Sequence, residues 1–346
     1  MFHKLARKHY SLLSEQSYPV SYGQEGVYLN LNINSNSQNP YKLYPEQNNL
    51  ALKEKYLKIL HHFSQEALLK KEQIQFAQGT ADAIDLIIRV FCEPSEDSIL
   101  VTNPTFSYYA YRARVQNVLV QDVPLLGNNL NLLNVEKIIL SSAKVLFLAT
   151  PNNPVGTSLN LFQIEEILQG FQGIVVVDEA YIEWTKNSSA LKWIGKYDHL
   201  IVLRTFSKIW GLAGVRCGAL IADESIIRAI TLTQNLFPLP TPIADLVYSH
   251  LDDLKTLAQD AAQMHDLKRD FINFLRTLKM VKKVYPGDAN FLLIEFQKAE
   301  LVEKKLGEAK ILVTNGSYAL PNTLRISIGT PSQMCLLKKN LLLMDL

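Results

Sequence analysis

The sequence predicts an α/β protein with a mostly parallel central sheet and a smaller α+β part. Between residues 97 and 223, short apolar runs alternate with helical patterns; the runs are DSILVT, NVLVQDV, AKVLFLAT, GIVVVDEA, HLIVLRT and CGALIAD. Such runs are typical of buried parallel strands. Near the end of the chain, NFLLIEF, KILVT and TLRISIG precede a closing helical pattern, as in a small α+β unit. The length of 346 residues also favours two lobes over one core.

Helices are predicted beside these strands. Segment 160–169 places Leu161, Ile164, Ile167 and Leu168 on one helical face, as the helix of a βαβ unit requires. Segment 79–94 begins near Gly79 and stops before a proline, and its N-terminus would offer free N–H groups to an anion. A stretch with three prolines, TLTQNLFPLPTP, interrupts regular structure before a long helical tract over 243–278.

These patterns suggest three regions. We expect an N-terminal arm with part of the small domain over 1–45, a large α/β domain over 46–245 and a small C-terminal α+β domain over 246–346. The Asn-rich segment 30–40 is predicted to be a loop.

Composition excludes several classes of function. With 35 basic and 33 acidic residues the net charge is only +2, and no dense basic stripe indicates a nucleic-acid partner. The cysteines at 92, 217 and 335 form no disulfide framework or zinc motif, and the seven scattered histidines suggest no metal site. No signal peptide or membrane-spanning run is recognisable. We therefore expect a soluble, cytoplasmic protein that acts on small molecules, without nucleic acid or membrane as partner.

Four polar residues follow the predicted strands of the central sheet. They are Asn153 in ATPNNPVGT, Asp178 and Tyr181 in VVVDEAY, and Lys208 in RTFSK. Each has an ordinary explanation alone, since Asn-Pro makes turns, Asp caps helices and lysine usually lies in solvent. Together they lie at the sheet edge where open α/β sheets bind ligands, which favours a shared site.

A reactive lysine in this setting suggests pyridoxal phosphate, because this cofactor commonly forms a Schiff base with a lysine. Its pyridine nitrogen needs a buried carboxylate, for which Asp178 is the candidate. Asn153 and Tyr181 would serve its phenolic oxygen, and Phe106 in NPTFSYY would cover the ring face. Its phosphate needs N–H groups, hydroxyls and a guanidinium, which the candidates Gly79, Thr80, Ala81, Thr205, Ser207 and Arg216 supply.

An ordered set of motifs also resembles a known family. These motifs are LYPE at 43–46, AIDLIIRVFCEP, PNNPVGT, VVVDEAYIEW, LRTFSK with GLAGVRCG, and LRISIGTP at 324–331. In them the chain is similar to class-II, fold-type I pyridoxal-phosphate-dependent aminotransferases, and in particular to the histidinol-phosphate aminotransferase branch. The resemblance extends over nearly the whole length.

The resemblance implies roles for matching residues. Lys208 would hold the cofactor as a Schiff base and shuttle a proton, with Asp178 and Tyr181 beside it in the catalytic centre. Arg325, together with Asn153, would bind the substrate's anionic group, and Tyr18 would face the substrate. Tyr44 in LYPE would reach the cofactor phosphate of a second subunit, which implies a homodimer.

Two positions depart from the histidinol-phosphate pattern. Thr314 stands where that branch usually has a second arginine for the substrate phosphate, and Ile33 stands where a glutamate is usual. Neither residue belongs to the cofactor set.

The implied reaction is a two-step transamination between histidinol phosphate and 2-oxoglutarate that gives imidazole-acetol phosphate and glutamate, a step of histidine biosynthesis. Transamination of aromatic amino acids and decarboxylation of threonine phosphate stay open as alternatives, because the outcome depends on which Cα bond is aligned with the cofactor. A nicotinamide site is disfavoured, since Gly211, Gly214 and Gly218 do not form the GxGxxG fingerprint. A non-catalytic regulatory module is also disfavoured, because only a short stretch precedes the first match.

Overall fold

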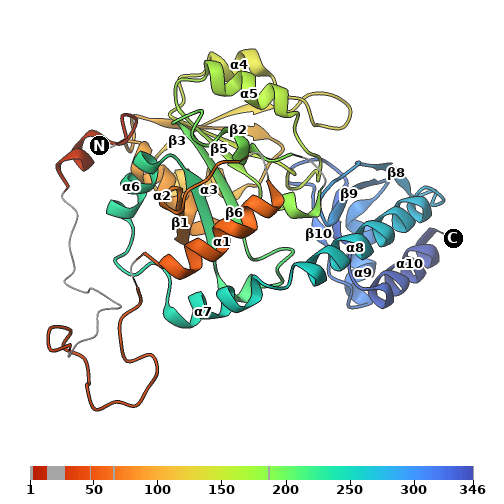
Figure 1. Cartoon of the computed structure of the whole chain (residues 1–346). Coiled ribbons are helices and arrows are strands. Elements are labelled where there is room, and N and C mark those ends of the chain that lie inside the picture. The colour runs from red at the N-terminus through yellow and green to blue at the C-terminus, as the bar shows by residue number, and fades with distance from the viewer. Residues whose placement is uncertain (1–2, 14–27, 47, 65–66, 186–187, 346) are drawn as a thin grey trace.

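A seven-stranded sheet forms the centre of the protein, for which the computed structural model describes residues 3–13, 28–46, 48–64, 67–185 and 188–345 (Figure 1). Its strands are β1 Ile74–Ala77, β2 Ser98–Asn103, β3 Leu119–Pro124, β4 Val145–Ala149, β5 Ile174–Asp178, β6 Leu200–Thr205 and β7 Gly218–Ala222. The spatial order is β1-β7-β6-β5-β4-β2-β3. Strands β2 to β6 pair in parallel, whereas β7 is antiparallel to both of its neighbours. The prediction of a mostly parallel sheet is confirmed.

All six predicted strands of the central lobe are present, as β2 to β7. Strands β4, β5 and β7 are buried along their whole length, because helices cover both faces of the sheet. Strand β1 was not predicted, since IQFA is a short run whose pairing with β7 comes from a distant part of the chain.

Helices pack on the two faces of this sheet. They are α1 Leu50–Phe63, α2 Thr80–Phe91, α3 Tyr108–Val115, α4 Val135–Ile139, α5 Leu161–Gly170, α6 Glu224–Thr233 and α7 Thr241–His250. Short 3-10 helices lie at Lys8–Leu12, Lys71–Gln73, Ile182–Trp184, Ala190–Trp193 and Ala213–Val215. Residues of α2, α3 and α6 share one apolar core with the sheet, and residues of α1, α4, α5 and α7 share the other. The predicted helices at 79–94 and 160–169 are α2 and α5.

A second sheet follows in the C-terminal part of the chain. Its order is β10-β11-β9-β8, with all neighbours antiparallel. The strands are β8 Val281–Val284, β9 Phe291–Phe296, β10 Thr314–Asn315 and β11 Thr323–Ser327, and the helices are α8 Leu254–Leu275, α9 Ala299–Glu308 and α10 Pro331–Asp345. These helices share a separate apolar core with the sheet, as expected for a small α+β unit. The expected domain boundaries at 45 and 245 stay a prediction.

Two expectations for this region were wrong in detail. The tract over 243–278 is not one helix, because it is interrupted at 251–253 and Asp253 caps α8 by accepting a hydrogen bond from Thr256 N at 3.3 Å. Of the predicted strand KILVT, only Thr314 lies in a strand. The apolar residues of KILVT predicted a buried strand, but β10 begins only at Thr314, which pairs with Arg325 of β11.

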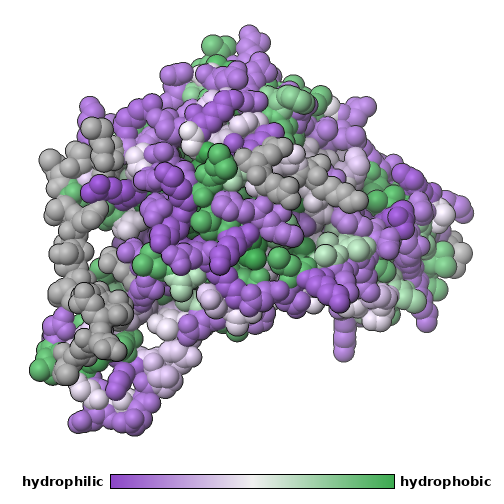
Figure 2. Space-filling view, in the orientation of Figure 1, coloured by the Kyte–Doolittle hydropathy of each residue, from purple (hydrophilic) through white to green (hydrophobic). Residues whose placement is uncertain are grey.

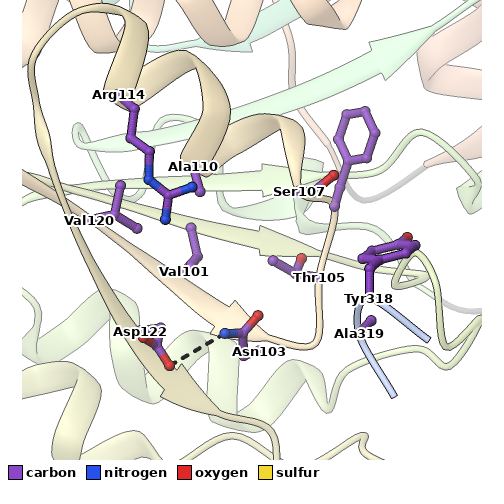
Figure 3. Close-up of a pocket in the computed structure, with 11 residues that line it drawn as sticks. Val101, Asn103, Thr105, Ser107, Ala110, Arg114, Val120, Asp122, Tyr318 and Ala319 are labelled. Atoms are coloured by element: carbon purple, nitrogen blue, oxygen red, sulfur yellow. Dashed lines mark hydrogen bonds between the residues drawn. The ribbon is translucent and has the colours of Figure 1, made fainter. Parts of the chain in front are cut away.

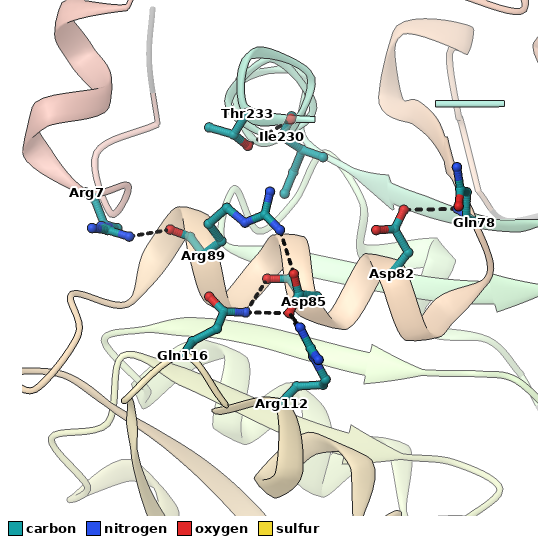
Figure 4. A network of polar contacts seen from close by, with 9 residues as sticks. All are labelled: Arg7, Gln78, Asp82, Asp85, Arg89, Arg112, Gln116, Ile230 and Thr233. Carbon is teal, nitrogen blue, oxygen red and sulfur yellow. Dashed lines mark hydrogen bonds and ion pairs between the residues drawn. The ribbon is translucent and has the colours of Figure 1, made fainter. Parts of the chain in front are cut away.

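A polar network joins α2 to α3 (Figure 4). Asp85 of α2 accepts hydrogen bonds at Oδ1 from Arg112 Nε and Gln116 Nε2, both at 2.8 Å, and at Oδ2 from Arg89 at 2.7 Å. Charge-assisted bonds to one nearly buried carboxylate fix the distance between the two helices. The network therefore fixes α2 relative to α3, and the candidate site residues lie at and near the N-terminal ends of these two helices.

Residues 28–46 contain no helix or strand and extend away from the rest of the described chain (Figure 1). The end of this segment returns at Tyr44, whose ring stacks on Phe237 with centroids 5.1 Å apart. The face seen in Figure 2 is largely hydrophilic, with apolar groups scattered across its middle. In the part of the chain that the structure describes, no helix has both the length and the apolar composition needed to cross a membrane.

Candidate active site

Lys208 and Asp178 lie close together at the C-terminal edge of the large sheet. Asp178 ends β5, and Lys208 follows the end of the neighbouring parallel strand β6. The Lys208 Nζ lies 5.0 Å from the centre of the Tyr181 ring, and its charge acts on the Asp178 carboxylate. The structure thus brings the three predicted catalytic residues into one place.

Asp178 is a buried carboxylate with few partners. Its side chain accepts hydrogen bonds from the Tyr109 hydroxyl at 2.6 Å and from Ala180 N at 3.1 Å. Burial raises the pKa of Asp178, and the bonds from Tyr109 and Ala180 and the charge of Lys208 oppose this effect. The balance leaves a carboxylate that a further cationic partner would stabilise.

Tyr109 was missed by the sequence analysis. It belongs to α3 and is completely buried, and its ring stacks on Phe147 with centroids 4.7 Å apart. Burial, with the nearby Asp178 carboxylate, raises the pKa of this phenol, so it remains a donor. The available signal was its position three residues after Phe106, since a helix that begins just after Phe106 has Tyr109 in its first turn.

Asn153 and Arg325 join the two sheets at the site. Arg325 of β11 donates from Nη1 to Asn153 Oδ1 at 2.6 Å and from Nη2 to Thr314 Oγ1 at 3.2 Å. Thr314 is also its partner across the strand pair β10 and β11. The guanidinium lies 5.4 Å from the centre of the Phe291 ring, which in turn contacts Tyr181 edge-on. Arg325 is therefore part of the same site as Tyr181 and Lys208.

A tight turn holds Asn153 in position. Asn152 N donates to Thr157 O at 2.8 Å, and Gly156 N donates to Asn152 O at 2.7 Å. Asn152 itself is buried, and its Nδ2 has no partner in the described part of the chain. Ala149, the last residue of β4, pairs with Asp178 of β5, and the turn places Asn153 shortly after that strand end.

The predicted phosphate-binding residues also converge. Gly218 pairs with Ala77 on one side and with Thr205 on the other, so the ends of β1, β7 and β6 form one row. A Cβ on Gly218 would lie only 2.8 Å from Thr80 N, which shows how closely β7 approaches the start of α2. Ser207 N donates to Thr205 Oγ1 at 3.1 Å, which turns the chain back toward this row.

Arg216 completes this group. A Cβ at Gly79 would lie 2.7 Å from Arg216 Nη2, so the guanidinium rests directly on the glycine that caps α2. Gly79 has φ +80°, a conformation that side chains rarely adopt. The helix N-terminus, two hydroxyls and a guanidinium are thus assembled as an anion-binding cradle.

A buried ion cluster lies behind the site and ties β5 to β6. Arg204, which precedes Thr205, pairs with Glu179 Oε2 and with Glu183 Oε1, each at 2.8 Å. Glu179 follows Asp178 and also accepts from Ser189 Oγ at 2.7 Å. Removing one member would leave buried charge uncompensated, so the cluster holds the ends of the two strands in a fixed relation.

The other residues singled out in the sequence lie in other segments of the chain than Lys208 and Asp178, or lie outside the part of the chain that the structure describes. Tyr18 lies outside the described residues. Tyr44 lies near the end of segment 28–46, where it stacks on Phe237, and Ile33 lies within that segment. Phe106 contacts Tyr109 edge-on with centroids 5.5 Å apart, which places it beside the Asp178 partner.

The assembled side chains fit pyridoxal phosphate in chemistry. The cradle at Gly79 suits a phosphate, because the guanidinium of Arg216 lies against the N-terminus of α2 there. A Cβ on Gly79 would push this guanidinium away. Asp178 suits a pyridinium, because its raised pKa reflects a buried carboxylate that lacks a full counter-charge. Lys208 lies over the Tyr181 ring and acts on Asp178, and Asn153 accepts a hydrogen bond from Arg325.

Comparison with known proteins agrees with this geometry. Residues 15–337 match the family model described as aminotransferase class I and II. A protein of Xylella fastidiosa (strain Temecula1 / ATCC 700964) named histidinol-phosphate aminotransferase is 39% identical over 273 residues, which are 76% of this chain and 75% of that protein.

Two solved structures are similar in fold. The histidinol-phosphate aminotransferase from Clostridium acetobutylicum superposes with a TM-score of 0.79 at 21% identity, covering 88% of this chain and 91% of that one. The histidinol-phosphate aminotransferase from Sinorhizobium meliloti in complex with pyridoxal-5'-phosphate gives a TM-score of 0.76 at 20% identity, covering 87% and 82%. The chain therefore belongs to the family of class I and II aminotransferases, and it is a pyridoxal-phosphate-dependent enzyme.

Proposed function

We propose that this enzyme transfers the amino group of histidinol phosphate to 2-oxoglutarate and so forms imidazole-acetol phosphate and glutamate. The observation that carries the proposal is the position of Arg325, which binds Asn153 and Thr314 and packs on Phe291 beside Tyr181. A guanidinium forms paired hydrogen bonds with either a carboxylate or a phosphate. The names of the sequence relatives support the choice of substrate.

The proposed roles follow from where each side chain lies. Pyridoxal phosphate, when bound, supplies an electron-accepting ring that stabilises negative charge at the substrate Cα. Lys208 would hold the cofactor through Nζ, and this amine, once displaced by the amino group of the substrate, would take the proton from that Cα. Asp178, held by Tyr109, keeps the pyridine nitrogen protonated, while Asn153 and Tyr181 bind the phenolic oxygen.

The remaining cofactor-binding residues position the group. The cradle holds the phosphate through the N-terminus of α2, the hydroxyls of Thr205 and Ser207, and Arg216. Phe106 covers one face of the ring. Because one site serves two substrates in turn, Arg325 binds the phosphate ester in the first half-reaction and a glutamate carboxylate in the second.

The experiment is a single half-reaction with purified, cofactor-loaded enzyme and no 2-oxo acid. Separate samples receive histidinol phosphate, phenylalanine, tyrosine or threonine phosphate, and the cofactor absorbance and the products are followed. We expect histidinol phosphate to change the absorbance and to yield imidazole-acetol phosphate. Reaction with the aromatic amino acids alone would assign the aromatic function, and carbon dioxide release from threonine phosphate would assign the decarboxylase.

We also infer a homodimer in which Tyr44 reaches the cofactor phosphate of the second subunit. The support is the extended course of residues 28–46, which lead away from the body of the chain in Figure 1, and the contact of Tyr44 with Phe237 near the end of that segment. We place the enzyme in the cytoplasm, because Cys92, Cys217 and Cys335 are all free thiols, as a reducing compartment favours.

A further inference from the structure

The loop between β10 and β11 carries a tyrosine that reaches from the small sheet to the large one. Backbone bonds from Ala319 N and Leu320 N to Gly316 O, at 2.9 and 3.0 Å, close the loop. Tyr318 lies within this closed turn, and the strands on either side bring Thr314 opposite Arg325. One hairpin thus carries Thr314, Tyr318 and Arg325.

Tyr318 forms part of a groove with the loop that follows β2 (Figure 3). The groove has a volume of about 280 Å³. Figure 3 shows the Tyr318 ring on the side of Thr105 and Ser107, the two residues that flank the proposed ring-covering residue Phe106. The groove therefore adjoins the proposed cofactor site.

The Tyr318 hydroxyl is available as a donor near the anion-binding arginine. The residue is 58% exposed, and its hydroxyl makes no hydrogen bond to the part of the chain that the structure describes. Partial burial raises the pKa of this phenol, Arg325 acts in the opposite direction, and Tyr181 adds to the increase. The phenol is therefore protonated at neutral pH and lies within the electrostatic reach of both residues.

Arg325 alone offers fewer free hydrogen-bond donors than the oxygens of a phosphate ester can accept. Two of its N–H groups are already used, one on Asn153 and one on Thr314. A phosphate monoester presents three strongly accepting oxygens, whereas a carboxylate presents two that one guanidinium can satisfy together. Thr314 contributes only a hydroxyl at this point of the hairpin.

We propose that Tyr318 is a specificity-determining residue whose hydroxyl donates to the third oxygen of a phosphate held by Arg325. This inference rests on the proposed function, since it names the group that distinguishes a phosphorylated amine from glutamate at the same site. The Thr314 hydroxyl, which accepts from Arg325, keeps its own hydrogen to donate to the same phosphate. Two hydroxyls then take the place of a second guanidinium.

The test compares Tyr318→Phe with Tyr111→Phe, a matched loss of one hydroxyl on an exposed tyrosine of α3 that does not line the groove. We expect Tyr318→Phe to raise KM for histidinol phosphate by about tenfold with little change in kcat, since one hydrogen bond to a charged group is lost. Inhibition by inorganic phosphate, competitive with glutamate, should weaken by a similar factor. The glutamate half-reaction and all values for Tyr111→Phe should stay near wild type.

The outcomes separate the inference from the function on which it rests. An equal loss on histidinol phosphate and glutamate would indicate a structural role and overturn the inference, as would no loss on either. If the wild-type enzyme does not use histidinol phosphate, the proposed function fails, and inorganic phosphate against acetate as inhibitors still decides whether Tyr318 selects phosphate. Unchanged discrimination between these two anions in Tyr318→Phe would then refute the role.

Discussion

At the scale of single residues, the buried carboxylate of Asp178 lowers the stability of the apoenzyme but is needed for the proposed reaction. Its folded-state pKa is raised by burial, so its favourable contribution to folding is present at low pH and is lost as pH rises through that pKa. As pH rises, the apoenzyme therefore increasingly carries the cost of a buried negative charge. A cationic cofactor ring would remove that cost.

We accordingly expect Asp178→Asn to stabilise the apoenzyme at neutral pH and to abolish most activity. An amide carries no charge to bury, but it cannot hold the pyridine nitrogen protonated, so transfer should fall by several orders of magnitude. Thermal unfolding of both apoproteins between pH 4 and 8 checks this, because the advantage of the variant should grow with pH. A variant less stable than wild type at every pH would show that the charged form is already compensated.

Some residues of the site can be predicted from the sequence and others cannot. Lys208 and Asp178 were predictable because Asp178 ends one apolar strand and Lys208 closely follows the next, and strand ends in a parallel sheet meet at one edge. Tyr109 was not predictable by this reasoning, because it lies on a helix among several other tyrosines and only packing selects it as the partner of Asp178. Its position three residues after Phe106 points to the site only when the start of α3 is known.

At the scale of elements, the approach of β7 to α2 determines the shape of the phosphate cradle. Gly218 allows this approach, because a Cβ there would lie 2.8 Å from Thr80 N and 3.0 Å from Gly79 C, and both are backbone atoms. Backbone cannot move aside as the end of a flexible side chain can. The contact is therefore sensitive to a single methyl group.

We expect Gly218→Ala to destabilise the protein by about 1–3 kcal/mol and to weaken cofactor binding by tenfold or more. Absorbance titration of the apoenzyme with pyridoxal phosphate and denaturant unfolding measure the two effects. Gly307→Ala is the matched control, since no atom lies within 4 Å of its Cβ on α9 and alanine favours helix by up to about 1 kcal/mol. Equal behaviour of the two variants would mean that the cradle tolerates the extra methyl.

The local sequence pattern did not predict the start of α8 or the existence of β1. The tract over 243–278 has helical periodicity on both sides of a break, and only the cap formed by Asp253 reveals that a new helix starts there. Strand β1 has four residues, and its identity depends on pairing with β7, which lies far away in sequence. Pairing between distant segments is not visible in a local window.

At the scale of the whole molecule, the proposed dimer makes each site depend on two chains. We expect the protein to run at twice the mass of its 39.2 kDa chain in light scattering. Lys208→Ala and Tyr44→Ala subunits should each be impaired alone, yet a mixed dimer should regain activity, because it contains one site with both native residues. A mixed dimer no more active than the average of its parents would place Tyr44 in the site of its own chain or in none.

The most direct test of the account is to identify the lysine that carries the cofactor. Borohydride reduction of the purified holoenzyme, followed by peptide mapping, should place the reduced cofactor on Lys208, in the peptide that contains Thr205 and Ser207. The Lys208→Ala variant should carry no such label. Label on another lysine, such as the buried Lys53 or Lys268, would contradict the site described here.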